Sequence, residues 1–79
     1  MNKEQFKEQL KLLRFGTKRD FVGMETLTVT RGTDNIADIY EDGRVSTSFT
    51  GFKALPTIEK ISLTQTINAY VCSMLEASL

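Results

Sequence analysis

Hydrophobic side chains near the start of the chain recur with a helical period. Phe6, Leu10 and Leu13 are spaced i, i+4 and i+7, so they fall on one stripe of a helix. Asn2 and the glutamine three residues later form a capping-box pair at its start. The pattern predicts a helix over residues 3–15, ended by the glycine that follows.

Between residues 24 and 51 the period changes to two, and β-branched and aromatic residues become frequent. The runs "METLTVTR", "NIADIYE" and "RVSTSFT" are separated by the turn segments "RGTDN" and "EDG". Three strands joined by short turns predict an antiparallel meander. Residues 17–23, which precede these strands, are expected to be a linker.

The position of Asp38 decides between two registers of this meander. A two-residue turn at Asp42 and Gly43 would bury Asp38 in mid-strand, where an unpaired carboxylate costs several kcal/mol. A three-residue loop over 41–43, with Gly43 in the left-handed region, shifts the register by one and turns Asp38 outward. We adopt this register, with a similar loop over 32–34. The buried face is then expected to hold Leu27, Val29, Ala37, Ile39, Val45, Thr47 and Phe49. The open face is expected to hold Met24, Ile36, Asp38, Tyr40 and Arg44 among hydroxyl-bearing residues.

The last part of the chain has helical periodicity with a change of phase. Pro56 is expected to open a short helical turn over 57–61. Ile58 and Ile61 project opposite to the apolar stripe that follows them. We therefore expect a separate main helix over 63–77.

These elements predict an α+β fold in which two helices cover one face of a small sheet. Its order is helix, three-stranded antiparallel meander, helix (αβββα), with a short helical turn before the last helix, in a single domain over residues 1–79. A chain of 79 residues builds a thin core. Pairing of two copies is a common remedy, so a homodimer is one expectation.

Basic residues gather at the start of a chain whose total charge is zero. Residues 1–19 carry six basic against two acidic residues, and residues 20–79 carry the balancing excess of acid. A neutral total argues against non-specific binding of nucleic acid, which depends on phosphate neutralisation. Charges at helical spacing nevertheless suit phosphates or an acidic protein surface, unless Glu4 and Glu8 simply neutralise a solvated face. These candidate interaction residues are Lys3, Lys7, Lys11 and Arg14, with Lys18 and Arg19 beyond them.

A second candidate interaction surface is the open face of the sheet. Ile36, Tyr40 and Arg44 are expected there, and aromatic and arginine residues are favoured in interfaces. The alternative is an ordinary solvated face, in which Tyr40 and Arg44 stack across neighbouring strands.

The composition excludes most classes of catalytic mechanism. The chain contains no histidine and one cysteine, which excludes histidine-based nucleophile pairs, multi-cysteine metal cages and internal disulfides. Cys72 has no cation beside it in the sequence and is expected to be an ordinary free thiol. Carboxylates alone can act as acid and base, but Asp38, Glu41 and Asp42 crowd a hairpin and are interpreted as turn and surface residues. We therefore expect no catalytic residue, metal or cofactor, and no enzymatic activity.

The chain resembles the short accessory proteins encoded by phages and prophages of Gram-positive bacteria. The resemblance rests on its size, the opening "MNKEQFKEQLK", the order of elements and the absence of catalytic histidine or cysteine motifs. It implies a protein that inhibits a host defence system or one that handles nucleic acid or assembly. Without a signal-peptide pattern or a membrane-length apolar run, we expect a cytoplasmic protein with no membrane partner. The function we expect is binding to a protein partner, and the alternative is weak binding of DNA or RNA through the N-terminal helix.

Overall fold

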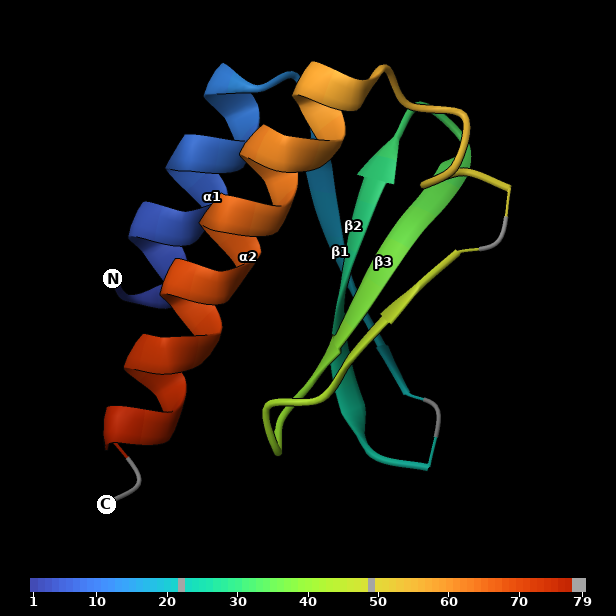
Figure 1. The fold of residues 1–79 in the computed structure, drawn as a ribbon. Coiled ribbons are helices and arrows are strands. Elements are labelled where there is room, and N and C mark those ends of the chain that lie inside the picture. Colours follow the sequence, from blue (N-terminus) through green and yellow to red (C-terminus); the bar gives the residue numbers. More distant parts are fainter. Residues whose placement is uncertain (22, 49, 78–79) are drawn as a thin grey trace.

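The computed structural model describes residues 1–21, 23–48 and 50–77. It confirms the α+β fold, with a helix, an antiparallel sheet and a second helix in that order. The sheet has the strand order β1-β2-β3-β4, and both helices lie side by side over one of its faces (Figure 1). The elements are α1 (Lys3–Leu12), β1 (Gly16–Phe21), β2 (Glu25–Arg31), β3 (Asp34–Tyr40), β4 (Val45–Thr47) and α2 (Thr57–Ala77).

Helix α1 starts where the sequence predicts and ends earlier. The Asn2 side chain accepts from the Gln5 amide, and the Gln5 side chain accepts from the Asn2 amide, so the capping box is complete. The helix ends at Leu12 rather than residue 15, because Arg14 adopts a left-handed conformation with φ of 68°. The Phe15 amide then donates to the Leu10 carbonyl at 2.8 Å, the closing bond of a Schellman motif.

The expected linker over 17–23 is wrong, because most of it forms strand β1. Thr17 pairs with Val29, and Arg19 pairs with Leu27, in an antiparallel ladder with β2. β1 is an edge strand with mostly exposed side chains. An edge strand of this kind lacks the alternating apolar residues by which strands are recognised in a sequence.

The register expected around Asp38 is confirmed. Ile39 pairs with Leu27 on one side and with Val45 on the other. Gly43 has a φ of 93°, and the Tyr40 amide donates to the Arg44 carbonyl at 2.8 Å across the three-residue loop. Asp38 consequently lies half-buried on the face away from the helices, where it accepts from the Thr28 hydroxyl at 2.6 Å.

The loop between β2 and β3 differs from the expectation. Arg31 pairs with Asp34, so the turn has two residues rather than three. The ladder recovers the predicted register through a bulge: Thr30 pairs with Asn35, whereas Val29 pairs with Ala37. Ile36 is the extra residue between these pairs, and its side chain is 2% exposed. The expectation that Ile36 lies on the open face is therefore wrong.

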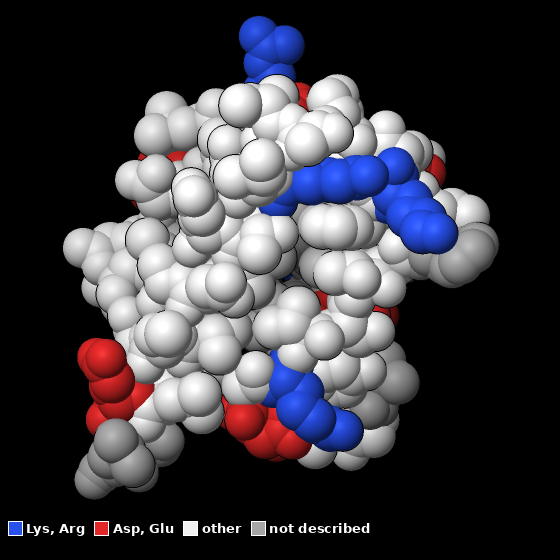
Figure 2. All heavy atoms as spheres, in the orientation of Figure 1, with Lys and Arg blue, Asp and Glu red and all other residues white. Residues whose placement is uncertain are grey.

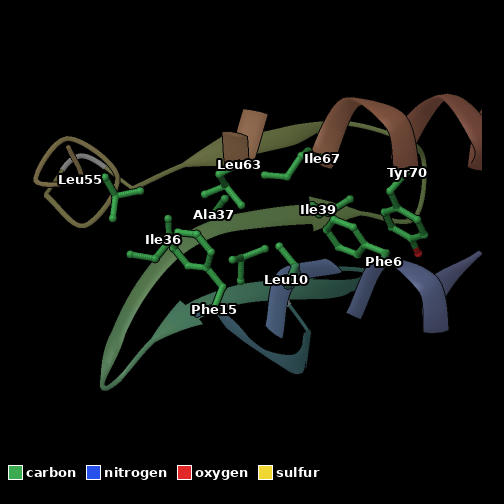
Figure 3. Close-up of a cluster of buried hydrophobic side chains, with 11 residues drawn as sticks. Phe6, Leu10, Phe15, Ile36, Ala37, Ile39, Leu55, Leu63, Ile67 and Tyr70 are labelled. Carbon is green, nitrogen blue, oxygen red and sulfur yellow. The ribbon is translucent and has the colours of Figure 1, made fainter. Parts of the chain in front are cut away.

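The core fills the space between the two helices and the sheet (Figure 3). Phe6 of α1 and Tyr70 of α2 stack with ring centroids 4.4 Å apart and an interplanar angle of 6°. The sheet contributes aliphatic side chains from β2 and β3. The buried hydrophobic residues are Phe6, Leu10, Phe15, Val29, Ile36, Ala37, Ile39, Leu55, Leu63, Ile67 and Tyr70.

The expected buried face is only partly buried. Val29, Ala37 and Ile39 belong to the core, and Leu27 packs against it half-buried. Val45 is 40% exposed and Thr47 is exposed, because the short edge strand β4 extends beyond the cover that α2 provides. Phe49, which was expected on the same face, lies outside the described residues.

Helix α2 runs without a break from residue 57 to residue 77. The expected turn over 57–61 is helical, but it continues directly into the main helix. Ile58 and Ile61, whose phase suggested a break, are 72% and 49% exposed. Their phase reflects a solvent-facing position rather than the end of a helix.

Candidate functional site

A cleft of about 330 Å³ lies between the helices and the sheet and is lined by residues of α1, α2 and the strands β1, β2 and β3. The start of α1 and the end of α2 form one wall, and the sheet forms the other. Leu27, Ile39, Tyr70 and Met74 give the cleft an apolar floor. Ile39 and Tyr70 also belong to the core, so the cleft lies directly beside the buried layer between the helices and the sheet.

Basic side chains surround this floor. Lys3 and Lys7 lie four residues apart on one flank of α1, because the capping box starts the helix at Lys3. Pairing of β1 with β2 brings Lys18 and Arg19 to the same cleft. These four cations face two carboxylates, Glu25 and Glu41, which leaves a net charge of +2 among the residues that line the cleft.

The ion pairs at the cleft are exposed and weak in energetic terms. Arg19 Nε lies 2.7 Å from Glu25 Oε1, and Lys7 Nζ lies 4.0 Å from Glu4 Oε1. Exposed pairs of this kind contribute about 0–1 kcal/mol each. The cations therefore remain available to an incoming anion.

Tyr70 adds a neutral hydrogen-bonding group to the floor. Its side chain is 6% exposed, and burial raises the pKa of its phenol above the ordinary value of 10.0. A phenol with the ordinary pKa is already protonated at neutral pH, and the raised pKa of Tyr70 extends the protonated form to more alkaline pH. A protonated phenol is a suitable donor to a carboxylate.

The structure divides the four basic residues that the sequence singled out on the first helix. Lys3 and Lys7 line the cleft, whereas Lys11 and Arg14 do not. Lys11 is 71% exposed and lies 3.6 Å from Glu8. Arg14 occupies the left-handed position after α1 and is exposed. The predicted stripe therefore does not form one continuous site.

The second predicted surface is reduced by the burial of Ile36. Tyr40 and Arg44 remain on the open face, and the Arg44 guanidinium lies 4.8 Å from the Tyr40 ring centroid, which confirms the expected stacking. Arg44 also donates to Asp42 at 2.8 Å. The Arg44 amide, with its guanidinium, holds the pKa of Asp42 below its usual value. Both side chains on this face are thus already engaged within the hairpin.

Several residues of the cleft are absent from the sequence prediction. Tyr70 and Met74 were interpreted as core positions of the last helix, and Leu27 as a core position of the sheet. Their sequence signals are ordinary, because the cleft depends on segments that are far apart along the chain. Of the candidate interaction residues named from the sequence, Lys3, Lys7 and Tyr40 line the cleft, and so do Lys18 and Arg19.

Other chemistry is sparse in the described residues. Over 1–21, 23–48 and 50–77, no three histidine, cysteine, aspartate or glutamate side chains lie close enough together to hold a metal ion. Cys72 is an exposed free thiol on α2. Neither helix, over the described part of the chain, has the length and apolar character that crossing a bilayer requires.

No protein-family model, curated protein or solved structure matches this chain. The functional argument therefore depends on the geometry of the cleft and on the chemistry of its residues.

Proposed function

We propose that this chain is a non-enzymatic protein-binding module that takes an acidic peptide segment of a partner protein into its cleft. The observation that carries the proposal is the combination of an apolar floor with a basic rim. An apolar side chain of the peptide would occupy the floor, while its carboxylates meet Lys3 and Lys7. A volume of about 330 Å³ is at the lower end of the range for ligand sites. It suits one or two side chains rather than a large cofactor.

The edge of the sheet favours an extended peptide as the occupant. β1 is an edge strand, and three of its residues, Thr17, Lys18 and Arg19, line the cleft. An edge strand can accept an added strand through its backbone, with alternate side chains entering neighbouring pockets. A peptide that pairs with β1 would thus deliver every second side chain toward the cleft. In keeping with the resemblance to phage accessory proteins, the partner we propose is a host protein.

The alternative function, weak binding of DNA or RNA, would use a different set of lysine side chains on α1. A phosphate backbone would use Lys7 and Lys11 alike, since contacts with phosphates depend on charge rather than on a pocket. An acidic peptide in the cleft would contact Lys7 but not Lys11. Lys7 and Lys11 form a matched pair, because each lies beside a glutamate three residues earlier.

The test is a selection of short random peptides against the whole chain, followed by fluorescence anisotropy with the enriched peptides. We expect enriched peptides to be acidic and to carry an apolar residue. Lys7→Glu should weaken their binding roughly tenfold or more, and Lys11→Glu should leave it within about twofold. The affinity should also fall as the salt concentration rises.

Three outcomes would overturn the proposal. The first is the absence of any enriched peptide, and the second is binding that is insensitive to Lys7→Glu. The third is a salt-sensitive gel shift of a single-stranded oligonucleotide that both substitutions abolish equally, which would establish the nucleic-acid alternative.

A further inference from the structure

Strand β1 forms one edge of the sheet. It stands at the end of the strand order and, among the described strands, pairs with β2 alone. It has six residues, whereas β4 at the other edge has three. An unpaired strand edge is a template for one more strand, and β1 is the longer of the two edges.

The register shows which backbone groups of β1 face outward. The Tyr40 amide donates to the Arg44 carbonyl, so the backbone groups of Tyr40 are directed toward β4. Thr26, which pairs with Tyr40, consequently directs its groups toward β1, where its partner is Asp20. This direction alternates from residue to residue along a strand. The residues of β1 with outward-facing backbone groups are therefore Thr17, Arg19 and Phe21.

Phe21 has two features that suit an added strand. Its amide donates to the carboxylate of the preceding Asp20 at 2.8 Å, which agrees with an amide directed away from β2. Its ring is 65% exposed and carries the Arg19 guanidinium at 5.6 Å from its centroid. Aromatic and arginine side chains are enriched in protein interfaces.

The charges of β1 are complementary to themselves when the strand is reversed about Arg19. Lys18 then lies opposite Asp20 of a second copy, and Thr17 lies opposite Phe21. Lys18 and Asp20 are both exposed, and opposite charges that face each other across antiparallel strands are stabilising. Arg19 meets its own copy, but Glu25 balances its charge within each chain at 2.7 Å.

The outer side of α2 offers a second copy no comparable pattern. No charged residue occurs between Lys60 and Glu76, and Figure 2 shows a broad surface over α2 without blue or red between its two ends. A surface without charge gives a second copy no electrostatic preference for one orientation. The edge strand β1, by contrast, favours one register.

We propose that two copies of this chain associate through β1, with the two strands antiparallel about a two-fold axis at Arg19. In this register every outward-facing residue of β1 meets an outward-facing residue of the second copy. Asp20 exchanges the Phe21 amide for Lys18 of the second copy, which frees that amide to donate to the Thr17 carbonyl across the axis. Two sheets of four strands thus become one continuous sheet, with the helices of both copies on the same face.

The association also bears on the cleft, because β1 is the edge at which the peptide of the proposed function would pair. The second copy and the peptide would then compete for the same backbone groups. This consequence rests on the proposed function, whereas the pairing of two copies does not.

The first test is the mass of the protein in solution by sedimentation equilibrium. We expect twice the chain mass of 8.9 kDa for the unaltered chain. Lys18→Asp and Asp20→Lys should each raise the dissociation constant of the dimer roughly tenfold or more, because each places like charges opposite one another at two symmetric positions. Lys11→Asp makes the same change of charge at a site on α1 that is 71% exposed, and it should leave the dimer intact.

An equal mixture of the Lys18→Asp and Asp20→Lys variants should recover the dimer, because opposite charges then face each other at both positions. This recovery also shows that both variants are folded. An unaltered chain that stays monomeric at high micromolar concentration would overturn the proposal. So would single variants that associate as well as the unaltered chain, or a mixture that stays monomeric.

The second test measures the mass of the unaltered chain in the presence of the most enriched peptide from the selection. An excess of this peptide should convert the dimer to a monomer with peptide bound. A dimer mass that saturating peptide leaves unchanged would overturn the competition at β1. The first test contains no peptide, so its outcome does not depend on the proposed function.

Discussion

The Arg31 guanidinium donates to the Glu59 carboxylate at 2.7 Å and so connects the end of β2 with the first turn of α2. The same group donates to the Leu13 carbonyl at 2.9 Å and lies 4.0 Å from the Phe15 ring centroid. Its side chain is 30% exposed. Arg31 thereby joins the sheet, the end of α1 and the start of α2.

We expect Arg31→Ala to lower the free energy of unfolding by about 2–3 kcal/mol, because it leaves a half-buried carboxylate and a carbonyl without their donor. Arg31→Lys should cost about 1–2 kcal/mol, since a single ammonium does not reproduce the planar fork. Urea unfolding measures both values. Arg44→Ala is the control and should cost at most about 1 kcal/mol, because the pair of Arg44 with Asp42 is exposed. Equal losses at Arg31 and Arg44 would contradict this account.

Two threonines on β2 make a matched pair with opposite expectations. Thr26 and Thr28 both lie on the sheet face away from the helices, yet they are 1% and 0% exposed, so the expectation of an open, solvated face is wrong at these two positions. The Thr26 hydroxyl has no hydrogen-bond partner among the described residues, whereas the Thr28 hydroxyl donates to Asp38. Thr26→Val should therefore raise the free energy of unfolding by about 1 kcal/mol, since it removes a buried unsatisfied hydroxyl in a residue of similar shape.

Thr28→Val should lower the free energy of unfolding by about 1–2 kcal/mol, because the half-buried carboxylate of Asp38 loses its donor. Unfolding curves in urea, recorded side by side, test the pair. The same sign of change in both variants would contradict the assignment of these two hydroxyls.

Arg14 adopts a strained backbone conformation at the end of α1. With a φ of 68° it is the one non-glycine residue of positive φ in the part of the chain described. Arg14→Gly should raise the free energy of unfolding by about 0.5–1 kcal/mol, because glycine adopts this conformation without strain. Lys11→Gly inside the same helix is the control and should lower it by about 1 kcal/mol. Thermal unfolding measures both variants. Destabilisation by Arg14→Gly would contradict this account, because it would show that the Arg14 side chain makes a contact that stabilises the fold by more than the backbone strain costs.

The buried phenol of Tyr70 predicts a loss of stability at alkaline pH. Because the pKa of Tyr70 is raised in the folded chain above 10.0, folding favours its protonated form. The contribution to stability is fully present below pH 10.0 and is lost as the pH rises through the higher folded value.

Near-ultraviolet titration of Tyr40→Phe, which leaves Tyr70 as the single tyrosine, should give a midpoint above 10.0. Tyr70→Phe keeps an aromatic ring to stack on Phe6 and should remove the part of the alkaline slope that comes from the phenol. A midpoint at or below 10.0 would contradict burial as the cause.

Local interactions made much of this fold predictable. The capping box of Asn2 needs only side chains and amides within one helical turn, so it can be recognised from the sequence. The register of β3 against β4 follows from a loop of three residues ending in Gly43, because a short loop permits few pairings and only one spares Asp38 from burial. The helix–sheet–helix order rests on periodicity, which is likewise a property of neighbouring residues.

What could not be foreseen depends on contacts between distant segments. β1 is a strand because its backbone pairs with the edge of β2, although its own residues suggest a linker. Ile36 is buried because a bulge inserts one residue into the ladder, and α2 is continuous because Ile58 and Ile61 face water. The cleft likewise depends on contacts between segments that are far apart in the sequence. Lys3 and Lys7 were visible in the sequence, but Arg19 and Tyr70 join them at one cleft only when the chain folds. A site built from α1, β1, β2, β3 and α2 has no period or motif along any one of these five elements.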